Sequence, residues 1–289
     1  MNHWITKLLM SYLKIKSHAK INLALNVLGK SNSLHKIESL ISFLTLHDLI
    51  KIRKIESKNH KIRFIGKFSK GIGSNNTISK LIKIIENKKL LKNKYQIIVK
   101  KNIPTKAGLG GGSMNAANIL NYFIKKKLIN LKKKEIIEIS NTIGSDVILG
   151  LYSKSLVLKH NKLINVSSFK QKFYTLIVKP NFGCSTKKIY SKVKKFSEIE
   201  FNSNFKKLFN LRYLKNRKND LESIALDQYP KLRILKKFLD NLCNNEFVRM
   251  TGSGSAMIAY FKSAKMCKDA EKKVNKKFRN YWSTTSKTI

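Results

Sequence analysis

A glycine-rich segment in the first half of the chain has the residue types and spacing of an anion-binding loop. Glycines occupy position 108 and positions 110–112, and an apolar helical pattern begins soon after Ser113. Glycine permits the turns and the close backbone approach that a nest of N–H groups needs, and a helix N-terminus adds free N–H groups and a positive dipole. The phosphate cradle, as we name this segment, comprises Pro104, Thr105, Lys106, Ala107, Gly108, Leu109, Gly110, Gly111, Gly112, Ser113 and Met114.

Two common nucleotide-binding motifs do not fit the phosphate cradle. No Gly-Lys-Ser/Thr sequence closes it, which excludes a Walker A loop, and the dinucleotide pattern G-x-G-x-x-G fails at Ser113. A nucleoside triphosphate held by a different architecture remains. The alternative is a flexible surface turn, which so many glycines directly before an apolar helix disfavour.

Two charged residues outside the cradle stand out by their position. Asp146 is the only carboxylate between Glu138 and Glu198, and it follows the predicted end of a helix, where the helix dipole disfavours negative charge. A residue placed against local preference suggests a function, and an ordinary turn aspartate is the alternative. Lys20 lies in a predicted strand between apolar residues, where an unpaired ammonium group is costly, so we expect it to have a partner.

Hydrophobic periodicity predicts the elements that must position these groups. In the first part of the chain we expect a strand over 12–27, an apolar β-branched run over 37–50 followed by another strand over 50–55, and a strand over 95–99. We also expect helices over 77–85, 116–124 and 131–143, and a short strand pair over 155–166. In the second part we expect strands over 173–178, 247–250 and 256–261. We expect helical stretches around 187–195, 205–212 and 221–243, and a helix over 263–278. Strands and helices that do not alternate as regular βαβ units predict the α+β class.

The composition excludes several classes of protein. The chain of 289 residues has 60 Lys and Arg against 16 Asp and Glu, a formal net charge of +44, and its 42% of hydrophobic residues exclude a disordered polycation. No stretch approaches the ~18 uncharged apolar residues of a membrane span. The lysine excess accompanies heavy use of Ile and Asn along the whole chain, which favours genomic base composition over a selected RNA-binding or membrane-binding surface.

The cysteines and the N-terminal segment indicate in which cellular compartment the protein is expected. Cys184, Cys243 and Cys267 are odd in number and far apart, which supports neither a disulfide framework nor a zinc site. The uncharged run over 8–13 is too short for the apolar core of a signal peptide. We expect a cytoplasmic protein, with a short organellar targeting segment as the alternative.

Five segments in collinear order resemble the motifs of the GHMP kinases, a superfamily of small-molecule kinases. The cradle resembles motif two, residues 17–23 motif one and residues 250–256 motif three, while 144–147 and 219–222 resemble two further family segments. The resemblance implies a two-domain α+β fold. An N-terminal ATP-binding domain is expected over 1–168 and a C-terminal α+β substrate-binding domain over 169–289, with a cleft between them.

The resemblance also implies roles in phosphoryl transfer. Asp146 would face Lys20 and accept the proton of the acceptor hydroxyl as it attacks the γ-phosphoryl group, and Lys20 would neutralise developing charge. ATP would bind the cradle as co-substrate and carry its own Mg²⁺, held by phosphates and water rather than by a protein-built metal site. Motif three would contribute Gly252, Ser253 and Gly254.

The form of the cradle resembles one branch of the superfamily, which phosphorylates a cytidine diphosphate-linked alcohol in non-mevalonate isoprenoid synthesis. The residues that this resemblance places at the acceptor are Asn22, His35, Thr186 and Tyr190. Leu34 stands where the branch has a tyrosine, and Met114 where it has a second serine. The alternatives are another small-alcohol kinase, such as homoserine kinase, and a non-catalytic basic RNA-binding protein. We expect a monomer or weak dimer whose partner is a small molecule, without a specific nucleic acid or membrane partner.

Overall fold

The computed structural model describes residues 12–31, 34–152, 155–159, 162–165, 172–202 and 205–289. The chain forms two compact units whose segments interleave along the sequence. Unit 1 comprises Met1–Ala19, Leu46–Thr105 and Gly110–Tyr152, and unit 2 comprises Lys20–Thr45, Lys106–Leu109 and Ser153–Ile289. The predicted domain boundary between 168 and 169 lies outside the described residues, as do residues 1–11. In the described part of the chain, no helix is both long and apolar enough to cross a membrane.

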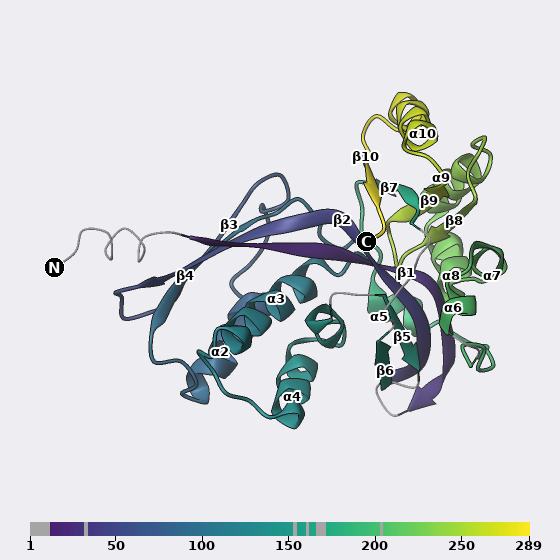
Figure 1. Cartoon of the computed structure of the whole chain (residues 1–289). Coiled ribbons are helices and arrows are strands. Elements are labelled where there is room, and N and C mark those ends of the chain that lie inside the picture. Colours follow the sequence, from purple (N-terminus) through teal and green to yellow (C-terminus); the bar gives the residue numbers. More distant parts are fainter. Residues whose placement is uncertain (1–11, 32–33, 153–154, 160–161, 166–171, 203–204) are drawn as a thin grey trace. The chain divides into compact units, whose positions relative to one another are not determined.

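In the part of unit 1 that the structure describes, α-helices lie beside a set of strands. Its strands are the first part of β1 (Leu13–Ser31), the second part of β2 (Leu34–Ile55), β3 (Lys61–Ile65) and β4 (Lys94–Lys100), and its α-helices are α2 (Thr77–Asn87), α3 (Gly111–Lys125) and α4 (Lys133–Ile143). Strand β4 pairs antiparallel with β2 and parallel with β3, and β1 pairs with β2. Figure 1 shows α2, α3 and α4 on the same side of these strands.

The core of unit 1 lies between these strands and helices. The helical spacing after the cradle buries one face of α3, including Ala116, Leu120 and Phe123. These side chains pack in one cluster with Ile97 of β4 and Leu81 of α2. A short 3₁₀ helix, η1 (Ile148–Leu151), packs against α3, so the chain that follows α4 is held beside the start of α3.

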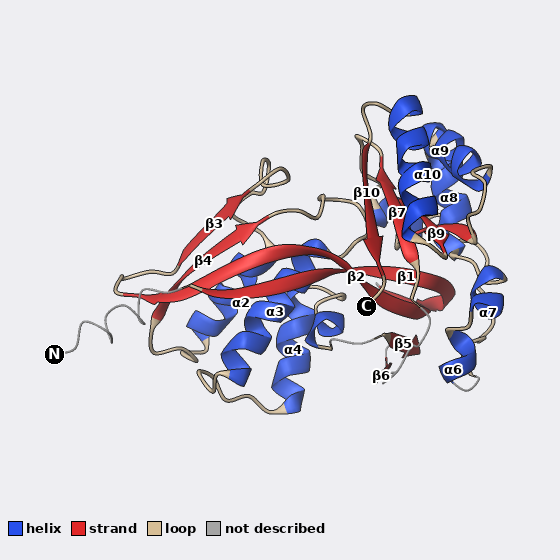
Figure 2. Ribbon diagram, turned by 45° about the horizontal axis from the view of Figure 1, so that its top comes forward, coloured by secondary structure: helices blue, strands red, loops and turns tan. Residues whose placement is uncertain are grey.

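Unit 2 contains an antiparallel sheet covered by helices. Strands β7 (Tyr174–Lys179), β8 (Phe247–Met250), β9 (Met257–Phe261) and β10 (Trp282–Lys287) lie in the order β10-β7-β9-β8. The unit's helices are α5 (Thr186–Tyr190), α6 (Phe205–Leu208), α7 (Leu211–Lys215), α8 (Asp220–Gln228), α9 (Pro230–Asp240) and α10 (Ala264–Lys277). Figure 2 shows α9 and α10 on the same side of this sheet. The rest of β1 and β2 also belongs to unit 2, where β2 pairs with β5 (Leu156–Lys159) and β5 with β6 (Lys162–Asn165).

The mixture of helices with two sheets confirms the predicted α+β class. The helical stretch predicted around 221–243 is divided in the structure into α8 and α9. Pro230 has no N–H group and disfavours a helical conformation at Tyr229, so α8 ends and Pro230 starts a new helix. Strands β3 and β10 were not expected from the sequence, and β10 is polar along most of its length.

Close packing of η1 against α3 makes Gly150 a test of this interface. A Cβ atom at Gly150 would lie 2.6 Å from the Cβ of Ala117 and 3.0 Å from the Sδ of Met114, whereas one at Gly29 would meet nothing within 4 Å. We expect Gly150→Ala to lower the free energy of unfolding by about 1–3 kcal/mol through overpacking. The matched change Gly29→Ala is expected to stay within about 0.5 kcal/mol of wild type. Urea unfolding followed by circular dichroism measures both, and equal stabilities of the two variants would contradict this packing.

Candidate functional site

The helix end of the phosphate cradle lies in unit 1, at the start of α3. Gly110 precedes the helix with φ 67°, a left-handed conformation that suits glycine, and it offers no side chain as a cap. The first helical hydrogen bond of this turn runs from the N–H of Met114 to the carbonyl of Gly110. The N–H groups of residues 111–113 therefore have no acceptor within the helix, which is the arrangement that binds phosphate oxygens.

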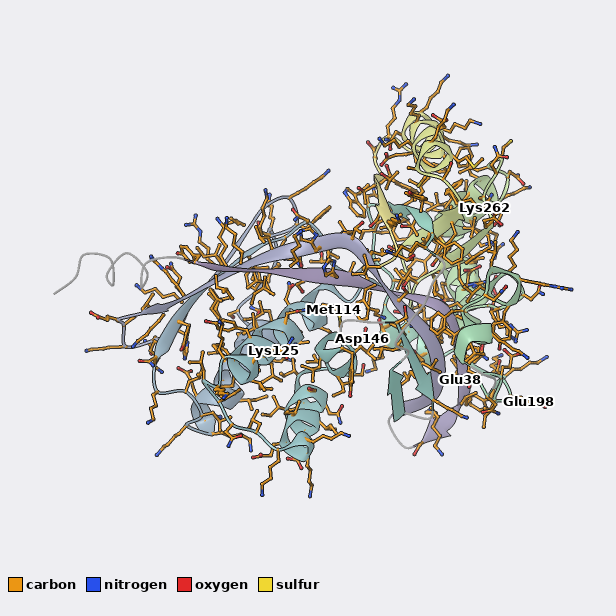
Figure 3. The ribbon with its side chains drawn as sticks, viewed as in Figure 1. Glu38, Met114, Lys125, Asp146, Glu198 and Lys262 are labelled. Carbon is orange, nitrogen blue, oxygen red and sulfur yellow. The ribbon has the colours of Figure 1, made fainter. Side chains whose placement is uncertain are left out.

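Asp146 lies in the segment that packs against this helix end. A Cβ atom at Gly144 would approach the Oγ of Ser113 to 4.0 Å, and Gly150 abuts Met114, so the chain from 144 to 150 follows the first turn of α3. Asp146 is half-buried in this segment. Figure 3 labels it beside the Met114 end of α3, with Lys125 at the other end. Unit 1 thus brings together the predicted carboxylate and one half of the predicted phosphate site.

The other half of the cradle lies in unit 2, where it meets motifs one and three. The N–H of Lys20 donates to the carbonyl of Leu109 at 3.0 Å, and the N–H of Ala256 donates to that of Ala107 at 3.2 Å. The Thr251 hydroxyl donates to the carbonyl of Gly108 at 3.2 Å. Three segments that the sequence singled out separately are therefore joined by hydrogen bonds in one unit.

Gly108 shows why this junction needs glycine. Its φ is 75°, and a Cβ atom there would lie only 2.1 Å from the carbonyl oxygen of Thr251. Real Cβ atoms do not approach an oxygen so closely, so a side chain at Gly108 would drive the cradle away from motif three. Gly252 of motif three packs against Gly108 from the other side of the contact.

Lys20 is buried and has the partner that its position in the strand predicts. Only 4% of Lys20 is exposed, and its Nζ donates to Asn22 Oδ1 at 2.9 Å. The N–H of Asn22 donates to the Thr251 hydroxyl at 3.1 Å, and its Nδ2 donates to the Ser39 hydroxyl at 2.8 Å. Asn22 therefore fixes the direction of the Lys20 ammonium group and links it to motif three.

The residues expected at the acceptor form two contacts in unit 2. The rings of His35 and Tyr190 lie 4.9 Å apart, centroid to centroid, at a tilt of 40°. The hydroxyls of Thr186 and Ser253 share a hydrogen bond of 2.7 Å. Burial, followed by the charge of Lys30, lowers the pKa of His35 below its ordinary value, so the imidazole is neutral at pH 7.

Leu34 and Met114 are two positions at which this sequence departs from the family branch. The side chain of Leu34, where the family branch has a tyrosine, lies outside the described residues. Met114 is buried, 1% exposed, with its sulfur against Gly150. Met114 is thus a packing residue on the inner side of α3 in this structure.

The structure gives the segment 219–222 a role that sequence analysis missed. Asn219 Nδ2 donates to the carbonyls of Met250 and Gly252 at 2.9 and 2.7 Å, while its Oδ1 caps α8 at Leu221. Glu222 Oε2 accepts the N–H of Met250 at 2.6 Å, and burial raises the pKa of Glu222. These side chains hold the start of motif three. The available signal was an asparagine at a helix start, which predicts a cap but not a second set of bonds.

The residues that the structure describes hold neither a metal-binding cluster nor a disulfide. Within the ranges that the structure describes, no three or more His, Cys, Asp or Glu side chains group as they would around a metal ion. Cys184 and Cys267 are buried and Cys243 is exposed, all as free thiols. Burial raises the pKa of Cys184 to about 11, which leaves this thiol protonated at neutral pH.

Comparison with known proteins identifies the family. Residues 76–154 match the model of the GHMP kinases N terminal domain. The chain is 58% identical to 4-diphosphocytidyl-2-C-methyl-D-erythritol kinase of Pelagibacter ubique (strain HTCC1062) over 97% of its own length and 100% of the relative's. It belongs to the 4-diphosphocytidyl-2-C-methyl-D-erythritol kinase family. The enzyme of that name from Clostridium tetani is 31% identical over 96% of this chain and 100% of the relative.

Solved structures show the same fold. A crystal structure of 4-(cytidine 5'-diphospho)-2C-methyl-D-erythritol kinase covers 95% of this chain and 99% of its own, with a TM-score of 0.76 at 20% identity. Homoserine kinase from Cytophaga hutchinsonii covers 96% of this chain and 95% of its own, with a TM-score of 0.68 at 14% identity. The resemblance to GHMP kinases and the fold that it implies are confirmed, and the chain is a kinase.

A matched pair of variants separates the bonds that Asn219 makes to motif three from its role as a helix cap. Asn210 caps α7 in the same way, since its Oδ1 accepts the N–H of Arg212, but it does not hold motif three. We expect Asn210→Ala to cost about 1 kcal/mol of unfolding free energy. Asn219→Ala is expected to cost about 1–3 kcal/mol more, because two buried carbonyls of motif three lose their donor. Urea unfolding measures both, and equal losses would show that Asn219 acts only as a cap.

Proposed function

We propose that this chain transfers the γ-phosphoryl group of ATP to the 2-hydroxyl of 4-diphosphocytidyl-2-C-methyl-D-erythritol, in non-mevalonate isoprenoid precursor synthesis. The observation that carries the proposal is 58% identity, over the whole length of the relative, to a kinase named for this acceptor. The phosphate cradle supports it independently, because an uncapped helix start after a glycine loop suits a nucleoside triphosphate.

ATP binds along the cradle in this proposal. The N–H groups of residues 111–113 hold phosphate oxygens, and the dipole of α3 favours their negative charge. Mg²⁺ comes with ATP as part of the substrate and is coordinated mainly by phosphates and water, as this hard cation prefers.

Asp146 and Lys20 carry the chemistry in this proposal. Asp146 accepts the proton of the acceptor hydroxyl as that oxygen attacks the γ-phosphorus and the bond to the β-phosphate oxygen breaks. Lys20 neutralises negative charge that gathers on the transferring phosphoryl group. Its hydrogen bond to Asn22 supports this role, because a fixed ammonium group needs no reorganisation during the reaction.

The acceptor is recognised by the ring pair of His35 and Tyr190. Neutral imidazole offers one donor and one acceptor, which suits the edge of a cytosine ring, and Tyr190 offers an aromatic face. Thr186 and Asn22 provide hydroxyl and amide groups for the rest of the acceptor. The contact of 4.9 Å between the two rings supports a shared role.

The remaining proposals concern the setting of the enzyme. We place it in a reducing cytoplasm, which fits its free thiols, as a monomer or weak dimer. The charge of +44 raises the local concentration of ATP and of the anionic acceptor by steering and needs no specific nucleic acid partner.

Replacing the proposed base tests the mechanism. We expect Asp146→Asn to reduce kcat by about 10²–10⁴-fold, because the amide cannot accept the proton, and to leave the Kd for ATP unchanged. Glu138→Gln, an exposed carboxylate on α4, serves as the matched control and should retain full activity. Steady-state kinetics and calorimetric titration with Mg·ATP measure both quantities. Retained turnover in Asp146→Asn would contradict the assigned base.

A comparison of acceptors tests the substrate. ATP consumption is measured with 4-diphosphocytidyl-2-C-methyl-D-erythritol and, separately, with homoserine. We expect kcat/KM to be higher for the cytidine-containing acceptor. A preference for homoserine would overturn the proposed substrate. No transfer to either compound, together with RNA binding that weakens steeply as salt is raised, would overturn the proposed reaction.

A further inference from the structure

A buried charged cluster lies in unit 1 that the proposed reaction does not use. Asp48 in β2 is 0% exposed, Lys101 is 3% exposed, and the two side chains form an ion pair. The antiparallel register explains their meeting, because Leu49 of β2 lies opposite Lys100 of β4 and the next pair brings together positions 48 and 101. Asn115 of α3, 1% exposed, completes the cluster.

Asp48 is fully engaged by groups from three parts of the unit. Its Oδ1 accepts the N–H groups of Asn102 and Ile103 at 2.8 and 2.9 Å. Its Oδ2 accepts Asn115 Nδ2 at 2.9 Å as well as the Lys101 ammonium group. A carboxylate offers about four acceptor positions, so the side chain has its full set of donors. Such complete satisfaction is what allows a charge to remain buried.

These donors lie on both sides of the phosphate cradle in the sequence. Ile103 directly precedes the cradle at Pro104, and Asn115 directly follows it at Met114. A Cβ atom at Gly111 would lie 3.0 Å from Ile103 Cγ2 and 3.3 Å from Lys101 Nζ, so the cluster lies directly against the first turn of α3. Asp48 therefore bonds to the strand end, to the entry of the cradle and to the start of α3 through one side chain.

We propose that Asp48, acting through Asn115 and the N–H groups of Asn102 and Ile103, is a positioning residue for the ATP phosphates. It holds the start of α3 so that the N–H groups of residues 111–113 point to the phosphate oxygens. Asp48 itself touches neither substrate. The inference rests on the proposed function only in taking the cradle as the site of ATP phosphates.

Charge and position predict opposite effects for one substitution. Asp48→Asn leaves the Lys101 ammonium group uncompensated next to the cradle, and an added positive charge by itself would tighten the binding of anionic ATP. The same substitution also replaces an acceptor by an amide donor that faces Asn115 and Lys101, and this displaces the helix start. A weaker affinity for ATP in Asp48→Asn therefore indicates that the helix start has been displaced. A tighter affinity indicates that only the uncompensated charge of Lys101 acts.

The experiment measures the Kd for Mg·ATP by calorimetry without an acceptor, together with the thermal midpoint of the full chain. We expect Asp48→Asn to raise the Kd about tenfold or more, since misplacement on the scale of 1 Å can cost this much or more. In turnover, KM for ATP should rise while KM for the acceptor stays unchanged. Ile85→Ala, a buried residue near the far end of α2, lowers stability without touching the cluster and should leave the Kd at the wild-type value.

Asn115→Leu provides a second variant that keeps the ion pair of Asp48 with Lys101. It removes only the bond to the helix, so we expect a folded protein with a Kd for ATP raised several-fold, about 3–10-fold. Unchanged or tighter ATP binding in both cluster variants would overturn the proposal, as would a Kd no higher than that of Ile85→Ala. A wild-type chain that binds ATP but does not phosphorylate the acceptor would contradict the proposed substrate and leave this inference standing. A wild-type chain that binds no ATP would overturn both.

Discussion

A phosphate site made of backbone needs N–H groups that the protein itself leaves without acceptors, and the proposed ATP site depends on this requirement. Helices α2 and α10 begin with Asn76 and Ser263, whose side chains accept N–H groups of the first turn. Helix α3 begins with Gly110, which has no side chain for this purpose. An uncapped start forgoes about 1 kcal/mol of stability, and bound phosphate can supply the missing acceptors.

Glycine makes the site possible but cannot fix its shape, because it is the residue with the greatest backbone freedom. Neighbouring groups must therefore hold the cradle from outside. In unit 2, Thr251 and Ala256 bond to its backbone at Gly108 and Ala107. In unit 1, Asp48 bonds on either side of it in the sequence. Within unit 2 the cradle is thus held by the ends of strands, and within unit 1 by a strand end and the start of a helix.

Local features of the sequence predicted much of this arrangement. The cradle, the amphipathic face of α3 and the placement of Asp146 after a helix follow from residues that are near one another in the chain. The second bonds of Asn219 and the cluster at Asp48 could not be predicted, because they depend on the register between distant segments. Strand β10 has no alternating apolar pattern and forms because β7 offers it a pairing edge.

Carboxylates are scarce in this chain, so the position of a carboxylate indicates more about its role than the position of a lysine does. Lysine is so abundant in a chain of +44 that its presence at a position says little, whereas there are only 16 acidic residues. Several of them accept backbone N–H groups from distant segments, as Glu38 does from Glu200, Asp220 from Val27 and Glu222 from Met250. Charged acceptors form stronger hydrogen bonds than neutral ones. In this basic chain these acidic side chains connect backbone segments that are distant in the sequence, whereas Asp146 lies in the segment that follows the uncapped start of α3.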